Sequence, residues 1–464
     1  MGGRAVVPRP VRAGGAGRLA APPAGGTAAG AQAAAEGRPP GSGDLAPVVG
    51  PSRTSRRCGT HGGEVNGMKV LFAASGWPTH YMAMVPLAWA LRAAGHEVRV
   101  AAQPAMHATI LRSGMPAVPV GPDVDYVAVR KRTLPHERSD GAGHRDPAEL
   151  RDAAERDEGG LFGAWNEATS AALDDTVAFA RAWRPDLVVG DTMAPAALVA
   201  AHVLGVPGVR HLWGPDILGT PEGAKILDIL PGYREQYERH GVSAPGDPAH
   251  RTVSPCPPSL QQPGLPERLS LRWVPYNGPG TTPGWLGVPP PRPRVCVTWG
   301  TSTTDVLGHE DRTVPDVLEA LAGLDVEVVV TVTAAERERL GRPAPGVRVL
   351  ESMPLHLLMP GCDLLVHQGG FMTALTAAHH GVPQLLVPQL PNQVSDAQVL
   401  EGAGVARRLP AEEAGVGSLR AAVEEVLGGR AYRVAAARLR TEILAQPSPA
   451  DVAADLAELA RTGP

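Results

Sequence analysis

Cysteine is scarce in this chain of 464 residues, and the four cysteines that it contains form no CxxC pair. No histidine stands at zinc-ligand spacing from them, so the sequence predicts neither a disulfide framework nor a structural zinc site. Cys296 and Cys362 lie inside apolar runs, where cysteine usually packs as a small hydrophobic side chain.

An excess of basic charge is also missing. The chain has 43 basic and 47 acidic residues, which give a formal net charge of −4. A general nucleic-acid-binding protein usually carries a clear basic excess, so this class is not expected. The GxxxxGK[ST] motif of P-loop nucleotide hydrolases is absent as well.

The sequence has no unbroken hydrophobic run of membrane-spanning length. Residues 364–395 carry no charged side chain, but they include Gly369, Gly370, Pro383 and Pro388 among several polar residues. A membrane helix rarely tolerates so many helix breakers and polar groups. We therefore expect a soluble, cytoplasmic protein that does not bind membranes.

The first 67 residues differ in composition from the rest. Glycine, alanine and proline fill 37 of these positions, and Phe, Tyr, Trp and Ile are absent from them. Such a segment cannot bury enough apolar surface to offset the entropy lost on ordering. We expect residues 1–67 to be a disordered tail, of the kind that an over-extended gene start would produce, and the folded protein to begin at Met68.

From Met68 onward, strand-like and helical stretches alternate. Strand-like runs occupy residues 69–75, 97–102, 116–121, 186–191 and 207–213, with helical stretches at 84–96, 168–183 and 194–204. Residues 122–167 are polar and irregular. Strands separated by helices in this way specify an α/β fold with a parallel sheet and helices on both of its faces.

The same alternation restarts after a proline-rich linker. The later strand-like runs are residues 294–300, 326–332, 347–352, 363–368 and 383–389. We expect a domain over 68–275, a linker over 276–293, a second domain over 294–446, and a C-terminal helix over 447–464 that packs back on the first domain. Because open parallel sheets bind ligands at the carboxyl ends of their strands, the cleft between the halves is the expected site.

The strongest local signal for a ligand site is residues 363–393. A buried strand leads into His367, Gly369 and Gly370, and a helix follows. A helix N-terminus after a glycine pair presents free N–H groups and the positive end of the helix dipole, which suits a diphosphate. His367 could donate to a phosphate oxygen, and Thr373 could add a hydroxyl. The alternative is an ordinary turn that needs glycine for its geometry alone.

Two more segments carry candidate site residues at strand ends. Gly300, Thr301 and Ser302 follow the first strand of the second half and could contact the phosphates from the opposite side. His80 follows the first strand of the first half, where it could act as a general base or simply cap a helix. Asp191 ends another strand, where it could orient the imidazole or cap the next helix.

These segments occur in a specific order along the chain. The most specific are THYMAMVPLAWALRAAGHEVRVAA, RPDLVVGD followed by RHLWGPD, RWVPYNGPGTTPGWL, and the block HQGG…GVPQLLVPQLPNQ. Together they resemble the bacterial GT-B glycosyltransferases that attach deoxysugars to macrolides and aromatic polyketides. The resemblance implies two Rossmann-like domains that face each other across a cleft. The acceptor would bind in the N-terminal domain and the donor in the C-terminal domain.

The resemblance also implies an activity: inverting transfer of a sugar from a dTDP-sugar to an aglycone hydroxyl, with no metal or other cofactor. On this reading His80 is the base that deprotonates the acceptor. The diphosphate is bound by His367, Gly369, Gly370 and Thr373.

Further site residues follow from the same resemblance. Asn392 and Gln393 match the pair that binds sugar hydroxyls. The nucleobase would be held by the backbone at Met353 and Leu355, with Asn277 and Trp299 at the border of its pocket. Some members of this branch need a cytochrome-P450-like helper, so a helper is expected among the partners, as is a homodimer.

Two departures from the family pattern keep alternatives open. Phe371 and Met372 stand where small residues usually follow the glycine pair, and Asn392 replaces a more common acid. Bulky side chains at the start of the helix would narrow a phosphate pocket, which favours a non-catalytic homologue that binds a donor or a partner protein. A sugar-nucleotide 2-epimerase, which shares the architecture, typically needs an arginine beside the diphosphate, and residues 363–393 contain none.

Overall fold

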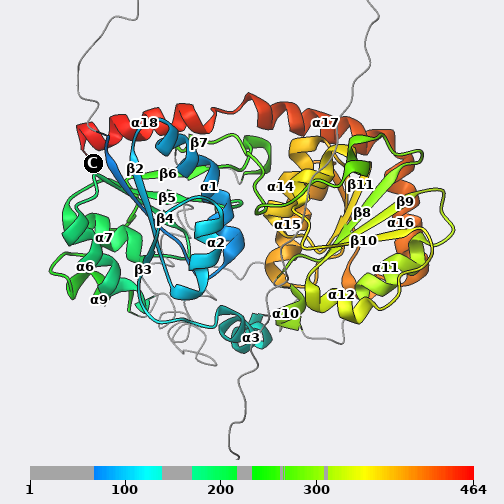
Figure 1. Cartoon of the computed structure of the whole chain (residues 1–464), viewed down its shortest axis with the longest axis horizontal. Coiled ribbons are helices and arrows are strands. Elements are labelled where there is room, and N and C mark those ends of the chain that lie inside the picture. Colours follow the sequence, from blue (N-terminus) through cyan, green and yellow to red (C-terminus); the bar gives the residue numbers. More distant parts are fainter. Residues whose placement is uncertain are drawn as a thin grey trace, which may run out of the picture. The chain divides into compact units, whose positions relative to one another are not determined.

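The computed structural model describes residues 67–137, 170–216, 232–261, 265, 267–301, 303–307 and 312–463 (Figure 1). The chain divides into one unit of residues 1–63 and a second unit of residues 64–464. The expected disordered tail lies almost entirely outside the described residues, and so does Ser302. The account below concerns the second unit.

The first half of this unit is built on a seven-stranded sheet with the order β3-β2-β1-β4-β5-β6-β7. Its strands are β1 (Lys69–Ala73), β2 (Glu97–Ala102), β3 (Ala117–Pro119), β4 (Leu187–Asp191), β5 (Gly208–His211), β6 (Arg251–Ser254) and β7 (Leu269–Ser270). All neighbouring strands pair in parallel. After β3 the chain returns to the other side of β1, so a crevice opens at the carboxyl ends of β1 and β4.

Helices cover both faces of this sheet because the side chains of each strand alternate between its faces. The helices are α1 (Pro78–Ala93), α2 (His107–Arg112), α3 (Tyr126–Glu137), α6 (Leu173–Trp183), α7 (Ala196–Leu204) and α9 (Tyr233–Glu238). Val70 and Phe72 of β1 pack with α1 and α2 on one face. Leu71 and Ala73 pack with α6, α7 and α9 on the other face.

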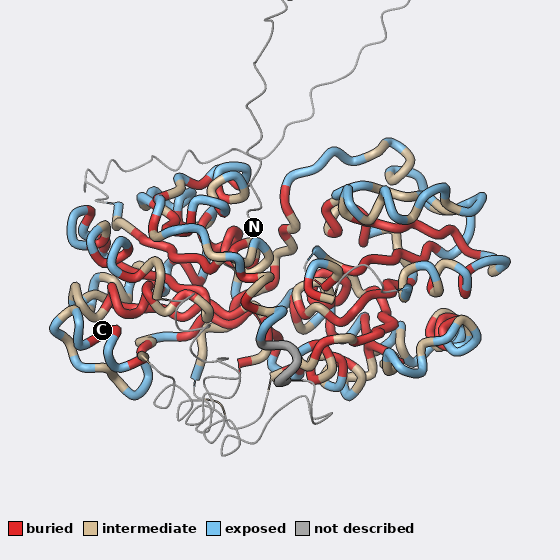
Figure 2. The backbone as a smooth tube through the Cα atoms, turned by 90° about the horizontal axis from the view of Figure 1, so that it is seen from below, coloured by how far each residue is buried: buried red, intermediate tan, exposed pale blue. Residues whose placement is uncertain are grey.

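The second half repeats this plan with a six-stranded parallel sheet of order β10-β9-β8-β11-β12-β13. Its strands are β8 (Arg294–Thr298), β9 (Glu327–Val332), β10 (Val347–Glu351), β11 (Leu364–His367), β12 (Gln384–Leu386) and β13 (Ala406–Arg408). Here the chain reverses between β8 and β11, which places the second crevice at their carboxyl ends. Most strands of the two sheets contain buried residues, and Figure 2 shows buried stretches in red in the interior of the structure.

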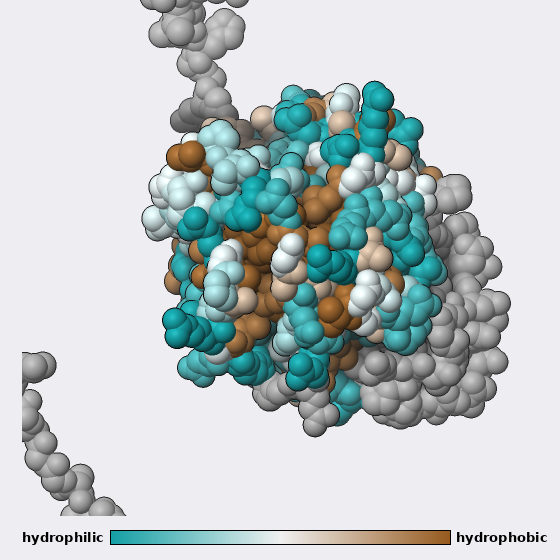
Figure 3. Space-filling model, turned by 90° about the vertical axis from the view of Figure 1, so that its right-hand side faces the viewer, coloured by the Kyte–Doolittle hydropathy of each residue, from teal (hydrophilic) through white to brown (hydrophobic). Residues whose placement is uncertain are grey.

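The helices of the second half pack on this sheet and beyond it. They are α10 (Thr303–Leu307), α11 (Thr313–Leu321), α12 (Ala334–Leu340), α13 (Leu355–Leu358), α14 (Phe371–His380), α15 (Pro391–Gly402), α16 (Val416–Gly428), α17 (Arg430–Ala445) and α18 (Pro449–Thr462). Helices α11 and α16 bury apolar side chains at helical spacing against β8 and β9. On the face drawn in Figure 3, hydrophobic side chains gather near the centre and hydrophilic ones surround them.

The last two helices reach different parts of the fold. Helix α17 packs on α14, and the buried side chains of Leu439 and Ile443 join the cluster around Leu375. Helix α18 packs on α1, with Val452 and Leu456 buried in the core of the first half. The end of the chain therefore contacts helices of both halves.

Several elements differ from their predicted bounds. The helix predicted at 84–96 begins at Pro78, because proline presets the backbone of a first helical turn and that turn does not need its missing N–H. The segment 122–167, predicted to be irregular, contains α3. The short strands β6, β7 and β13 were not predicted. The earlier start of α1 matters for function, because it places His80 in the first turn of a helix.

Candidate functional site

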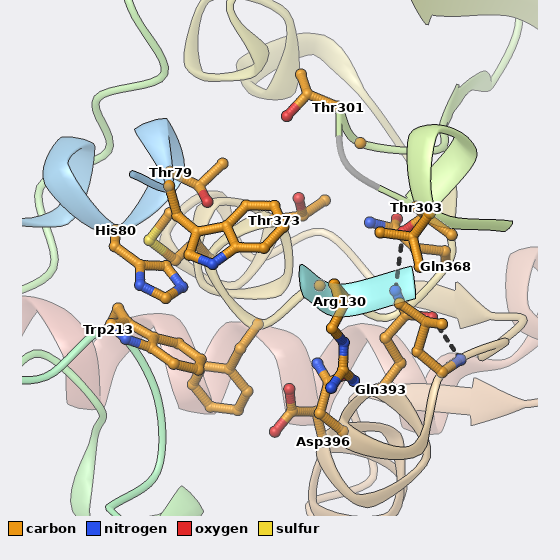
Figure 4. Close-up of a pocket in the computed structure, with 18 of the residues that line it drawn as sticks. Thr79, His80, Arg130, Trp213, Thr301, Thr303, Gln368, Thr373, Gln393 and Asp396 are labelled. Carbon is orange, nitrogen blue, oxygen red and sulfur yellow. Dashed lines mark hydrogen bonds between the residues drawn. The ribbon is translucent and has the colours of Figure 1, made fainter. Parts of the chain in front are cut away.

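The two sheet reversals bring their loops to one cavity of about 320 Å³ (Figure 4). Seven of the predicted catalytic and binding residues line it: His80, Gly300, Thr301, Gly370, Thr373, Asn392 and Gln393. They come from both halves of the chain, as the expected position of the ligand requires. Asp191, His367 and Gly369 lie behind this lining, and the four nucleobase candidates do not line it.

His80 and Asp191 form a pair at the carboxyl ends of β1 and β4, two central strands of the first sheet. Nδ1 of His80 lies 3.4 Å from Oδ1 of Asp191, whose side chain is buried. The carboxylate is anchored by the backbone N–H groups of Met193 and Ser75, at 3.1 and 3.2 Å, and by the Ser75 hydroxyl. An imidazole held through Nδ1 can present its Nε2 to a substrate.

The surroundings of Asp191 keep its carboxylate ionised. Burial by itself would raise the pKa of Asp191, but His80 and the donors from Ser75 and Met193 outweigh it, and the pKa is lowered below its ordinary value. A negative charge at this position stabilises the imidazolium that forms when His80 accepts a proton.

Trp213 holds the other side of the His80 ring. The two rings are stacked, with centroids 4.4 Å apart and an angle of 20° between their planes. The indole N–H of Trp213 is buried and has no hydrogen-bond partner within the described part of the chain, although the residue lines the cavity. Trp213 therefore restricts the imidazole from one side.

The glycine turn after β11 leads directly into α14. Gly370 is the N-cap residue of this helix, no side chain caps the helix, and no acidic residue lies in its first turn. The first N–H groups of α14 are therefore available to an anion next to the Thr373 side chain. Gly369 has φ = +98°, a backbone conformation that favours glycine.

His367 lies beneath this turn, and the structure does not place it at the cavity. Its Nδ1 accepts the N–H of Gly369 at 3.1 Å, and its Nε2 lies 2.9 Å from Oε1 of Gln384. Burial lowers the pKa of His367 to about 4, although the Gln384 contact opposes that shift. With both ring nitrogens engaged, the neutral imidazole fixes the shape of the turn and has no N–H left for a phosphate.

Gln368 joins the two glycine loops of the second sheet, a contact that the sequence analysis did not predict. A Cβ atom at Gly300 would lie 2.6 Å from its Nε2, and a Cβ at Gly370 would lie 3.1 Å from it. The Gln368 amide thus occupies space beside both glycines, and a Cβ at Gly300 would require the amide to shift. Its Oε1 is buried without a partner among the described residues, and the residue lines the cavity.

The bulky residues at the start of α14 are accommodated. Phe371 is buried and packs against Gly214 of the first half, where a Cβ would come within 3.3 Å of its ring. Phe371 and Met372 form part of the cavity wall beside the turn. The Phe371 ring occupies space that Gly214 leaves open, and the narrowing of the phosphate pocket stays a prediction.

Asn392 and Gln393 begin α15 and differ in how far they are engaged. Gln393 is buried; its Oε1 accepts the N–H of Leu390 at 3.1 Å and its Nε2 donates to Thr303 Oγ1 at 2.9 Å (Figure 4). Asn392 is exposed, and its Oδ1 accepts from Arg130 of α3 at 3.3 Å. Asn392 therefore has more hydrogen-bonding capacity to offer a ligand than Gln393.

The nucleobase candidates occupy a different region. The indole of Trp299 is buried, and its N–H donates to Oε1 of Gln389 at 2.7 Å. Asn277 is joined to α13: its Oδ1 accepts the backbone N–H of His356 at 3.0 Å. Leu355 begins that helix, so the structure brings Leu355 and Asn277 close together.

Met353 lies just before α13, and its carbonyl accepts from the hydroxyl of Thr331 at 3.3 Å.

Among the described residues, no group of three or more His, Cys, Asp or Glu side chains is arranged to hold a metal ion. In the same part of the chain, no helix has the length and apolar character needed to cross a membrane.

Several cavity residues were not predicted from the sequence, among them Arg130, Trp213, Gln368 and Asp396. Gln368 and Asp396 stand within or just after motifs that were recognised, so their proximity to the glycine pair and to Asn392 was a usable signal. Arg130 lies in a segment predicted to be irregular. Trp213 could not be found by pattern, because its stacking on His80 brings together residues that lie far apart in the sequence.

Comparison with known proteins gives the family. The erythromycin biosynthesis protein CIII-like N-terminal domain matches residues 89–300, and the C-terminal domain of the same description matches residues 315–459. The chain is 37% identical over 425 residues to 10-deoxymethynolide desosaminyltransferase of Streptomyces venezuelae, covering 85% of this chain and 97% of that protein. It is 38% identical to TDP-daunosamine transferase DnrS of Streptomyces peucetius, covering 84% and 97%.

Solved structures agree with this assignment. The glycosyltransferase VinC in complex with dTDP superposes with a TM-score of 0.74 at 31% identity, covering 85% of this chain and all of that chain. The spinosyn rhamnosyltransferase SpnG with thymidine diphosphate gives a TM-score of 0.71 at 30% identity, covering 84% and 100%. These matches confirm the predicted fold and the resemblance: the chain belongs to the erythromycin biosynthesis protein CIII-like family and is a glycosyltransferase with the GT-B fold.

Proposed function

We propose that the protein transfers a deoxysugar from a dTDP-sugar to a hydroxyl of a polyketide-like aglycone, with inversion and without a metal ion. The observation that carries the proposal is a single cavity that has a candidate base on one side and a candidate anion-binding helix N-terminus on the other. His80, backed by Asp191, comes from the first half, and the uncapped N-terminus of α14 comes from the second half.

The first half supplies the base. With Nδ1 of His80 directed at Asp191, the lone pair of Nε2 accepts the proton of the acceptor hydroxyl as its oxygen attacks the anomeric carbon. The bond from that carbon to the diphosphate oxygen breaks on the opposite face of the sugar, so the configuration inverts. The proton stays on His80 as an imidazolium beside the Asp191 carboxylate.

The second half stabilises the leaving group. The diphosphate gains negative charge as the sugar leaves, and the free N–H groups of α14, with the positive end of its dipole, face that charge. The Thr373 hydroxyl adds a donor, and the Thr301 hydroxyl adds one from the loop after β8. These neutral donors do the work that a metal ion does in other transferases, which supports a metal-independent reaction.

A calorimetric titration of dTDP into the full chain, with a chelator present and with UDP as comparison, tests the donor site. Micromolar binding that prefers dTDP and needs no metal is the expected result. No binding of either nucleotide would refute the donor site and favour a homologue that acts as a partner protein. A cytochrome-P450-like helper and a homodimer stay predictions. Screening aglycones as acceptors with and without a helper tests the former.

Catalysis by His80 needs its own measurement. A His80→Ala variant should bind dTDP as the natural protein does but should lose sugar transfer to any aglycone that the natural protein accepts. Undiminished transfer by this variant would refute the role of His80 as the base.

A further inference from the structure

Asp396 is an acidic side chain in the cavity that the proposed reaction does not use. It lies one helical turn after Asn392 in α15, and residues three and four apart share a helix face, so Asn392, Gln393 and Asp396 all line the same cavity. In Figure 4 its carboxylate points into the cavity, towards the side on which Trp213 lies. It therefore stands beside the positions proposed to bind the sugar.

The carboxylate of Asp396 has no compensating partner within the described ranges. Neither a hydrogen bond nor an ion pair reaches it there, and the nearby guanidinium of Arg130 donates to Oδ1 of Asn392. Burial raises the pKa of Asp396 to about 8, so a free carboxylate at this point is unfavourable. A half-buried acid of this kind gains stability from a cation more than from a neutral hydroxyl.

The rest of the cavity strengthens this preference. A dTDP-sugar brings a negatively charged diphosphate to the N-terminus of α14, in the cavity that also contains Asp396, and like charges in a partly buried space repel. A positive group on the sugar would remove that repulsion. Trp213 and Phe371 line the same cavity, and aromatic rings favour alkylated ammonium groups.

We propose that Asp396 selects donors whose sugar carries an amino group, by pairing its carboxylate with the sugar ammonium. The inference rests on the proposed function, because it assigns the substrate class of the same donor site. Asn392 and Gln393 would bind sugar hydroxyls, and Asp396 would bind the ammonium group one helical turn farther along α15.

The test compares two donors that differ at one position: a dTDP-deoxysugar with a dimethylamino group and the same sugar with a hydroxyl there. Their dissociation constants are measured calorimetrically on the full chain. The natural protein should bind the amino donor about tenfold more tightly or better, as a charge-assisted hydrogen bond implies. Asp396→Asn should lose that preference. Asp455→Asn, the same change at an exposed position of α18, should keep it.

Each outcome decides a separate question. If the natural protein binds dTDP but prefers the hydroxyl donor or shows no preference, the inference about Asp396 is overturned and the donor site stands. A preference that persists in Asp396→Asn overturns it equally. If the natural protein binds neither dTDP nor either donor, the proposed function itself fails. Should Asp396→Asn lose cooperative unfolding, Asp396→Ser replaces it in the comparison.

Discussion

Replacing Asp191 by asparagine tests the pair at the centre of the proposed reaction. The change keeps the size of the side chain and removes its charge. The carboxylate faces His80 at 3.4 Å, so the imidazolium formed during transfer would lose the negative group that stabilises it. We expect a large loss of turnover with little change in the affinity for dTDP, because Asp191 does not line the cavity.

The size of the loss follows from the distance. Two unit charges 3.4 Å apart interact by about 5 kcal/mol at an effective dielectric constant of about 20. Since about 1.4 kcal/mol corresponds to a factor of ten in rate, complete loss of this term sets an upper limit between three and four powers of ten. Asparagine still orients the ring through its carbonyl, so we expect kcat to fall about a thousandfold.

The same substitution also has a stability cost. Each oxygen of Asp191 accepts a backbone N–H, from Met193 at 3.1 Å and from Ser75 at 3.2 Å. The amide of an asparagine must oppose one of these donors, which costs about 1–3 kcal/mol of the free energy of unfolding. Asp186→Asn is a matched control, because Asp186 accepts the N–H of Lys69 at 2.7 Å before the other end of β4, away from His80.

The assay is the release of dTDP from a dTDP-deoxysugar in the presence of an aglycone that the natural protein glycosylates, read in a single turnover. Circular dichroism and denaturant unfolding show whether each variant is folded. Turnover of folded Asp191→Asn within tenfold of the natural protein would refute the role of the pair. So would an equal loss in Asp186→Asn, since stability and not charge would then explain the effect.

Three further substitutions test the turn at α14. Gly369→Ala places a Cβ at φ = +98° and 3.3 Å from the carbonyl oxygen of Gln393, so unfolding in denaturant should show a loss of about 1–3 kcal/mol, and an unchanged midpoint would contradict the strain. Thr373→Val should weaken dTDP binding about three- to tenfold by calorimetry, whereas the exposed Thr441→Val should not; equal affinities would exclude a Thr373 contact. Burial lowers the pKa of His367 to about 4, below the ordinary 6.5 that the residue regains on unfolding. The neutral imidazole therefore makes its full contribution to the free energy of unfolding above pH 6.5, and this contribution is lost as pH falls towards 4. This amounts to about 2 kcal/mol between pH 7 and pH 5, which His367→Gln should remove from the pH dependence of unfolding; an unchanged dependence would contradict a neutral buried imidazole.

Much of the fold followed from sequence because the strands are buried on both faces. Runs such as residues 97–102 and 326–332 contain mostly apolar residues, and their observed bounds agree with the prediction. Short strands at the sheet edge, such as β7 and β13, have two and three residues and give no such signal. Their pairing depends on the strand beside them, which a local pattern cannot show.

The site was predicted best where local geometry determines chemistry. Gly370 and Thr373 follow a strand and begin a helix, so their place at an anion site could be read from order along the chain. The orientation of His367 was harder to predict. Its position in the sequence is next to the turn, but its ring faces inward, towards Gln384. Trp213 and Arg130 reach the cavity only through long-range packing, which one sequence without an alignment does not reveal.

The position of α18 limits how this protein can be recombined with a relative. A designer who exchanges second halves would cut the chain at the proline-rich segment 276–293 and take everything after it from the other parent. That exchange also replaces α18, whose Val452 and Leu456 are packed in the core of the first half, and the Pro447 carbonyl that accepts the N–H of Arg272 at 2.7 Å. A workable chimera therefore needs two crossovers, one in the linker and one before α18, so that the first half keeps the helix that packs on it.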